Sequence, residues 1–95
     1  MNKTPEEWAK EVKARWFSDE ESGSVDLNAA EAEEWGKNPE FQATLKRNAR
    51  NHAKELAKKT GKFGAVIRDN AGNVLDDFTI VNGDVFEDPV RAAPH

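Results

Sequence analysis

The residues of this chain that could take part in chemistry are two histidines and a few clustered acidic side chains. The sequence contains no cysteine, which removes thiol nucleophiles and thiolate metal ligands, and no G-x-S-x-G motif marks a nucleophilic serine. His52 falls on the apolar side of a long helical pattern, and His95 is the last residue of the sequence. A histidine at the rim of the core is therefore a better interpretation of His52 than a catalytic base.

The acidic clusters are also better explained by structure than by catalysis. Neighbouring residues of a strand point to opposite faces, so Asp76 and Asp77 are not expected to share one substrate. Asp69, Asn73 and Asp76 lack the spacing of a calcium loop and its closing glutamate, and turn formation explains them. We therefore expect no enzyme, no catalytic residue, no cofactor, no metal and no small-molecule substrate. A Ser–His–Asp set is assembled in space, so an unrecognised cluster around His52 or Asp77 stays open as the alternative.

The net charge of −4 conceals three blocks of opposite sign. Residues 1–40 carry five basic and eleven acidic side chains, residues 41–62 carry seven and one, and residues 63–95 carry two and six. The basic block coincides with a helical pattern over residues 38–61, which is capped by Asn38-Pro39. On a wheel of about 100° per residue, its apolar residues share one side and its cations centre on the other. The expected partner- or anion-binding face consists of Lys46, Arg47, Arg50, Lys54 and Lys58.

Three surroundings suit such a basic face: solvent alone, an acidic protein surface, and nucleic acid. The acidic surface would come from residues 18–40 or from a neighbouring copy. Phosphate contacts would make binding fall steeply with salt. The sequence pI of about 5.2 and the lack of an RRM, KH or zinc-finger signature argue against specific base readout. Non-specific contact with DNA is therefore the form of nucleic-acid binding that the sequence favours.

Two shorter helices are predicted before the basic helix. Thr4-Pro5 with Glu7 forms a capping box and a proline-led first turn, and Asn28 with Glu31 forms a second box. The polar segment SDEESGS at residues 18–24 is expected to be a loop. Residues 1–37 are thus predicted to be an N-terminal helical part.

The three tryptophans Trp8, Trp16 and Trp35 suggest more apolar area than one small domain can bury. Trp8 and Trp16 lie at helical spacing, as residues of a core stripe do. Aromatic residues are also enriched at subunit interfaces. We therefore expect these rings to supply core and, in part, a subunit interface.

From Lys62 onward the apolar period changes to two. KFGAVIR and NVLDDFTIV are typical of strands joined by a turn, and Asn82-Gly83 favours a hairpin that adds DVFED at residues 84–88. We predict one α+β domain over residues 1–95. Its three helices, the third long and amphipathic, precede a small antiparallel sheet of two to three strands at residues 62–88 and a tail at 89–95.

The same sequence argues against contact with a membrane. No apolar run approaches the roughly 20 residues of a membrane span, and the start MNKTPEEWAK carries acids where a secretory signal is basic and then apolar. The absence of cysteine fits a reducing compartment. We expect the protein in the cytoplasm of a bacterial cell or in a virion assembled there.

In PEFQATLKRNARNHAKELAKKTGKFGAVI, a helix rich in Ala and basic residues runs through Thr60-Gly61 into a strand. In this respect residues 39–94 resemble neck or tail-completion proteins of tailed bacteriophages. NVLDDFTIV and EDPVRAAPH occupy the places of the strand and terminal approach that follow there. The resemblance implies a non-catalytic protein that forms a ring at the head–tail junction, through which DNA passes.

A second stretch is similar to another family. DLNAAEAEEWGKNPEFQATL, residues 26–45, is similar to the helical N-terminal segment of FecR-type anti-sigma regulators, in which a Trp precedes an Asp/Asn-Pro helix start. That similarity implies a regulatory role.

Two hypotheses follow. The leading one is a self-associating structural component of a phage virion, whose partners are further copies and other assembly proteins and whose charge blocks set the register between copies. The alternative is a small regulatory protein that binds nucleic acid or a transcription component through the basic face of helix 38–61.

Overall fold

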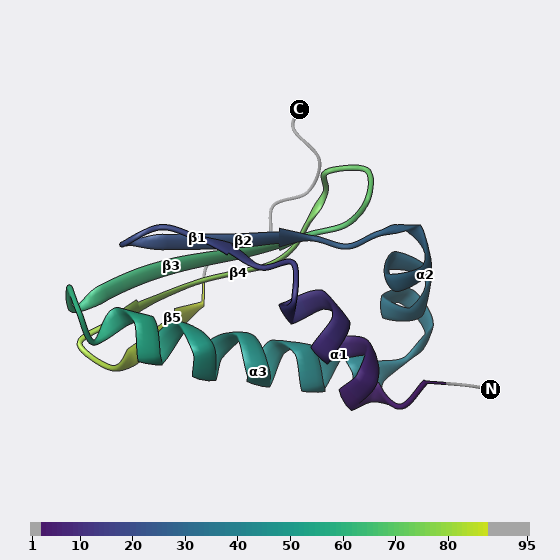
Figure 1. Cartoon of the computed structure of the whole chain (residues 1–95), viewed down its shortest axis with the longest axis horizontal. Helices are drawn as coiled ribbons and strands as arrows, with labels where there is room; N and C mark the ends of the chain where they lie inside the picture. The colour runs from purple at the N-terminus through teal and green to yellow at the C-terminus, as the bar shows by residue number, and fades with distance from the viewer. Residues whose placement is uncertain (1–2, 88–95) are drawn as a thin grey trace.

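The computed structural model describes residues 3–87 and shows an α+β protein with three helices and a five-stranded mixed sheet (Figure 1). The helices are α1 (Pro5–Lys13), α2 (Ala29–Lys37) and α3 (Pro39–Ala57). The strands are β1 (Phe17–Ser18), β2 (Ser22–Asp26), β3 (Lys62–Arg68), β4 (Val74–Val81) and β5 (Asp84–Glu87). They lie in the sheet in chain order. The β2–β3 pair is parallel and the other neighbouring pairs are antiparallel.

The predicted helix starts are confirmed. The Thr4 hydroxyl accepts from the Glu7 amide at 3.1 Å, and the Glu7 carboxylate accepts from the Thr4 amide at 2.8 Å. Asn28 and Glu31 form the same reciprocal pair at 2.8 and 2.9 Å. The Asn38 side chain accepts from two amides in the first turn of α3. Each cap satisfies backbone donors that a helix start leaves without partners.

The predicted hairpins are confirmed as well. The segment KFGAVIR is β3, and NVLDDFTIV contains β4. Asn82 and Gly83 have φ of 50° and 86° between β4 and β5, the left-handed pair that a two-residue hairpin turn requires. Residue 88 of the predicted third strand, and the tail at 89–95, lie outside the described residues.

The prediction of a loop at residues 18–24 is wrong. This segment contributes to β1 and β2, so residues 1–37 are not wholly helical and the sheet is neither small nor purely antiparallel. β2 pairs with β3 from Ser22↔Gly64 to Asp26↔Arg68, and α2 and α3 form the crossover between them. Only Gly23 and Val25 of β2 are buried. Two buried positions in a polar segment give almost no period-2 signal.

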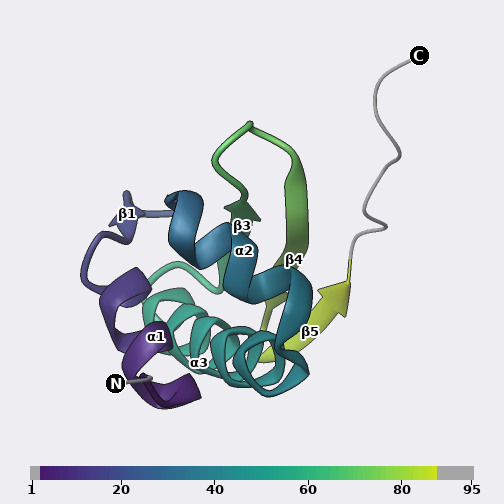
Figure 2. The ribbon, with the colours of Figure 1, turned by 90° about the vertical axis from the view of Figure 1, so that its right-hand side faces the viewer.

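The helices α1 and α3 pack on one face of the sheet, and α2 closes one end of this two-layer arrangement (Figures 1 and 2). Alternate residues of the central strands turn into this layer, where they are buried. The apolar ones in β3 and β4 are Phe63, Ala65, Ile67, Phe78 and Ile80. No helix of the described chain covers the opposite face, which we call the outer face.

Gly23 is required by the packing of Trp16 against β2. A Cβ atom at this position would lie 2.7 Å from Trp16 Nε1 and 2.9 Å from Phe63 Cζ. The Trp16 indole N–H is buried and has no hydrogen-bond partner within residues 3–87. The glycine thus allows the indole to approach the strand closely, with its N–H left as one unsatisfied donor.

Candidate interaction surfaces

The solvent side of α3 carries part of the predicted basic face. Arg47, Lys54 and Lys58 are exposed and fall within about 40° of one another on the helical wheel. We call these three residues the α3 stripe. Lys58 makes an exposed ion pair of 2.9 Å with Glu55 of the same helix, whereas Arg47 and Lys54 make no ion pair with any described residue. An exposed pair within one helix contributes little stability, so the stripe remains a cationic surface.

Arg50 departs from the expectation that all five cations point away from the core. Its guanidinium makes a bidentate pair with Asp76 of β4 at 2.8 and 3.0 Å, and its Nε donates to Glu87 of β5 at 3.0 Å. The Arg50 side chain is only 17% exposed and that of Asp76 only 6%. The guanidinium also lies over the Phe78 ring, 4.3 Å from its centroid. Arg50 therefore joins α3 to two strands and is not available to an anionic partner.

This pairing has the expected electrostatic consequences. The hydrogen bonds to Asp76 raise the pKa of Arg50 above its ordinary value, so its charge is fixed at every accessible pH. The hydrogen bonds from Arg50 lower the pKa of Glu87. Both effects favour the charged forms of the pair.

Lys46 occupies an intermediate position. It is half-buried, and its ammonium lies 5.7 Å from the centroid of the Trp35 ring, where a cation–π contact is favourable. Five residues were predicted to form one basic face. Three of them lie in the α3 stripe, whereas Lys46 lies over the Trp35 ring and Arg50 is paired with the buried Asp76.

The tryptophans belong to the interior. Trp35 is 8% exposed and packs edge-on against Phe41, with ring centroids 6.2 Å apart. Trp8 and Trp16 are half-buried and pack against the same core. None of the three rings is fully exposed, because each packs against the core of its own copy. The proposed subunit interface at Trp8, Trp16 and Trp35 therefore has no exposed ring to support it.

The exposed aromatic side chains are instead Phe17 and Phe86, at 67% and 54%. Sequence reasoning missed both. Phe17 pairs with Ser24, and Phe86 pairs with Thr79. The sequence carries one sign for Phe86: as the neighbour of Val85 in a strand, it must point to the opposite face of the sheet. This sign could be interpreted only once the inner face of the sheet was known.

His52 lies at the rim of the core, as predicted. Its ring meets the Trp16 ring edge-on at 5.7 Å, and burial together with the charge of Lys13 lowers its pKa. Within residues 3–87, no hydrogen bond joins His52 to a serine or a carboxylate.

The acidic clusters are engaged in structure. Asp76 faces Arg50, while Asp77 pairs in register with Val66 and so points to the other face of the sheet. Asp69 accepts from the Asn73 side chain and from the amides of Asn73 and Ala71, which lowers its pKa and closes the turn between β3 and β4. Within the described part of the chain, no group of three or more His, Asp and Glu is placed to hold a metal ion.

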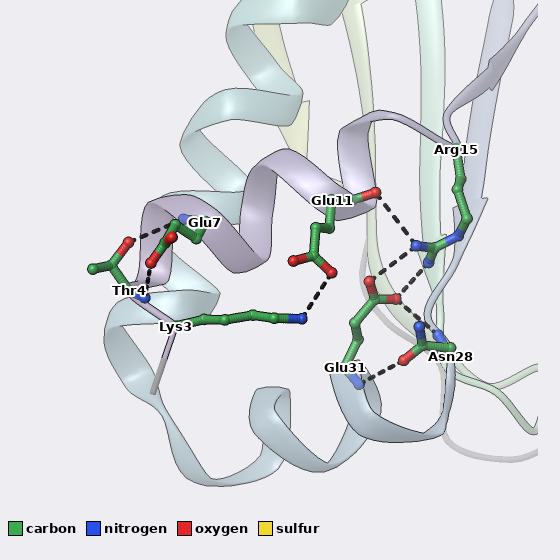
Figure 3. A network of polar contacts seen from close by, with 7 residues as sticks. All are labelled: Lys3, Thr4, Glu7, Glu11, Arg15, Asn28 and Glu31. Carbon is green, nitrogen blue, oxygen red and sulfur yellow. Dashed lines mark hydrogen bonds and ion pairs between the residues drawn. The ribbon is translucent and has the colours of Figure 1, made fainter. Parts of the chain in front are cut away.

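A polar network joins α1, β2 and α2 (Figure 3). Arg15 pairs with the fully buried carboxylate of Glu31 and also donates to the backbone carbonyls of Glu11 and Asp26. Glu31 also accepts from the Asn28 amide, so one carboxylate caps α2 and holds the end of α1. The sequence predicted the cap, but not the arginine, which lies sixteen residues away.

One open groove lies beside the end of α3. It has a volume of about 480 Å³ and is lined by Ser18, Asp19, Glu20, Leu56, Lys59 and Thr60. The Asp19 carboxylate is already occupied by the amides of Glu21 and Ser22. No pair of lining side chains is joined by a described hydrogen bond that would mark a nucleophile and its base.

No helix of the described chain is both long enough and apolar enough to cross a membrane. Comparison with family models, curated proteins and solved structures finds no match to this chain.

Proposed function

We propose that this protein is a non-catalytic structural component that associates with further copies of itself. The observation that carries the proposal is the exposure of Phe17 and Phe86 on the outer face of the sheet. The resemblance of residues 39–94 to phage neck proteins supports a place at the head–tail junction of a virion. Other assembly proteins would then be its further partners.

The strand register places both phenylalanines on the outer face. Phe17 is opposite Ser24 in the sheet, and Ser24 is opposite Val66. Because both neighbours of Val66 in β3 are buried on the inner face, Val66, Ser24 and Phe17 point to the outer face. On the other side of the sheet, Phe86 is opposite Thr79, which is opposite Gly64. The two rings therefore lie on either side of the outer-facing residues of β3 and β4, which include Gly64, Val66, Asp77 and Thr79. Four strand spacings of about 4.8 Å put the rings roughly 19 Å apart.

The size of a stable interface decides how much of this face must take part. Two phenylalanines bury at most about 500 Å², whereas a standard interface needs roughly 800 Å² from each partner. Contact with a second copy must therefore also cover residues between the rings. Gly64 is small enough to let a ring of the partner approach closely.

Sedimentation velocity and light scattering test this proposal. We expect a mass above that of the monomer at high micromolar concentration, and a shift toward monomer in the double variant Phe17→Ser with Phe86→Ser. Both rings are exposed, so the variant should melt at nearly the wild-type temperature. Ala71→Ser, in the exposed turn between β3 and β4, is the control that should leave the mass unchanged. A wild-type chain that stays monomeric at every salt concentration would contradict the proposal.

The alternative function is binding of nucleic acid, or of a transcription component, through the basic face of α3. It is favoured by the exposed α3 stripe and now excludes Arg50, whose guanidinium is occupied. We expect any duplex DNA binding at low salt to fall steeply at moderate salt and to be lost in Arg47→Glu with Lys54→Glu. Binding that this variant retains in full would sink this alternative.

A further inference from the structure

The charges of the fold are separated in space as well as in sequence. Of the exposed cations, Arg47 and Lys54 have no ion-pair partner among residues 3–87, and Lys58 meets only a solvent-exposed acid of its own helix. On the same side of the helical wheel fall the uncharged Ala43 and Asn51 and one exposed acid in the first turn, Glu40, so cations outnumber acids there. The solvent side of α3 is thus a positive surface in a chain whose net charge is −4.

The complementary surface lies in the turn between β1 and β2. Asp19 fixes this turn by accepting from the amides of Glu21 and Ser22 at 3.0 and 2.8 Å and from the Ser22 hydroxyl at 3.0 Å. Glu20 and Glu21 are exposed and make no ion pair with a described residue. Lys59 lines the same groove as Glu20, but no ion pair within 4 Å joins the two. The turn therefore presents two carboxylates on a backbone whose shape is set by hydrogen bonds.

We propose that the α3 stripe of one copy binds the β1–β2 turn of a second copy. Lys54 and Lys58 are one helical turn apart, about 6 Å along the axis, and adjacent Cα atoms of the turn are about 3.8 Å apart. Long flexible side chains bridge this difference, so Glu20 and Glu21 can each reach one cation. Because the stripe and the turn are different surfaces, each copy offers one of each, which suits either a two-fold pair or a closed ring.

This inference rests on the proposed self-association and names its second contact. The α3 stripe points away from the sheet, so its contact is separate from that of the phenylalanines on the outer face. The phenylalanines supply buried area, whereas charge pairs between exposed surfaces fix orientation and association rate more than affinity. A second copy is favoured over a polyanion because the chain has an excess of acid outside α3. Glu20 and Glu21 are among the carboxylates that would repel a polyanion, and in the proposed contact they pair with cations of the second copy.

The experiment uses two double charge reversals in the full-length chain. Lys54→Glu with Lys58→Glu makes the stripe acidic, and Glu20→Lys with Glu21→Lys makes the turn basic. Each variant alone should lose about tenfold in association constant at low salt, the effect of two exposed pairs turned into repulsions. An equimolar mixture of the two variants should recover association, because every stripe then meets a turn of opposite charge.

Matched controls separate this contact from the effect of net charge. Lys10→Glu with Lys62→Glu makes the same change in net charge as the stripe reversal, at exposed cations that have no described ion pair. It should leave the association constant within about twofold of wild type. Circular dichroism and melting confirm that all variants fold, which is expected because every substituted side chain is exposed.

The possible outcomes distinguish the inference from the proposed function. A wild-type chain that assembles and does not respond to the reversals, or reversals that the mixture does not repair, overturns this inference alone. Loss of duplex DNA binding in the stripe variant, with association unchanged, overturns it in favour of nucleic acid. A wild-type chain that remains monomeric overturns the self-association and this inference together.

Discussion

Helix α3 carries cations on two sides that look alike in the sequence and differ in the fold. On the side facing β4 and β5, Arg50 is tied to the buried carboxylate of Asp76. On the solvent side, Arg47 and Lys54 meet no acid of the described chain. Helical periodicity places the Cα atoms, but the neighbouring strand determines whether a long side chain turns inward. A run of basic residues is therefore not one surface, and its members must be tested separately.

The largest difference between the two sides should be in stability. Arg50→Ala leaves the Asp76 carboxylate buried without a partner, which should cost about 3–5 kcal/mol in the free energy of unfolding. Arg47→Ala removes an exposed cation and should change that free energy by less than about 0.5 kcal/mol. Urea unfolding followed by tryptophan fluorescence measures both.

Two further variants keep this test decisive if Arg50→Ala does not fold. Arg50→Lys retains the charge without the planar fork, so it should fall between wild type and Arg50→Ala. Arg50→Met with Asp76→Leu removes both charges and should recover most of the loss. Equal stability of the Arg47 and Arg50 variants would contradict the contrast between the two sides.

Arg15 tests whether, away from α3, an arginine paired with a buried carboxylate also stabilises the fold more than an exposed cation does. Its carboxylate partner Glu31 is fully buried, but the Arg15 side chain itself is 42% exposed and Glu31 keeps the Asn28 amide as a donor. Arg15→Ala should therefore cost less than Arg50→Ala, about 2–3 kcal/mol. Thermal melts monitored by circular dichroism measure the loss, with Lys10→Ala as the exposed control on α1. A loss no greater than that of the control would show that the buried carboxylate needs no arginine.

The same contrast explains how far sequence reasoning reached. Thr4 with Glu7, Asn28 with Glu31, Asn38-Pro39 and Asn82-Gly83 act through neighbours a few residues away, and all of them were predicted correctly. Local rules of capping and turn formation suffice for such features.

The features that were missed depend on partners far away in the sequence. β2 exists because it pairs with β3, some forty residues later, and its polar residues give no local sign of that pairing. Arg50 turns inward because β4 and β5 place Asp76 and Glu87 beside it, 26 and 37 residues further on. Phe17 could be recognised as exposed only after the inner face of the sheet was known. The candidate surface was therefore predicted in part: the α3 stripe was found, but its boundary and the exposed phenylalanines were not.

The smallest expected effect is that of the Lys13 charge, which acts without direct contact, on the pKa of His52. Burial, and then the charge of Lys13, lower the pKa of His52 below its ordinary 6.5. The unfolded chain therefore binds a proton at this site at a higher pH than the folded chain does, and stability should decrease as pH falls below about 6.5. Lys13→Gln should raise the pKa of His52 while leaving it below 6.5, because burial remains. An NMR titration of the imidazole measures the shift, with His95→Asn to remove the second histidine signal. A His52 pKa that is unchanged in Lys13→Gln, or that rises above 6.5, would show that exposed cations on α1 do not influence the buried side of α3.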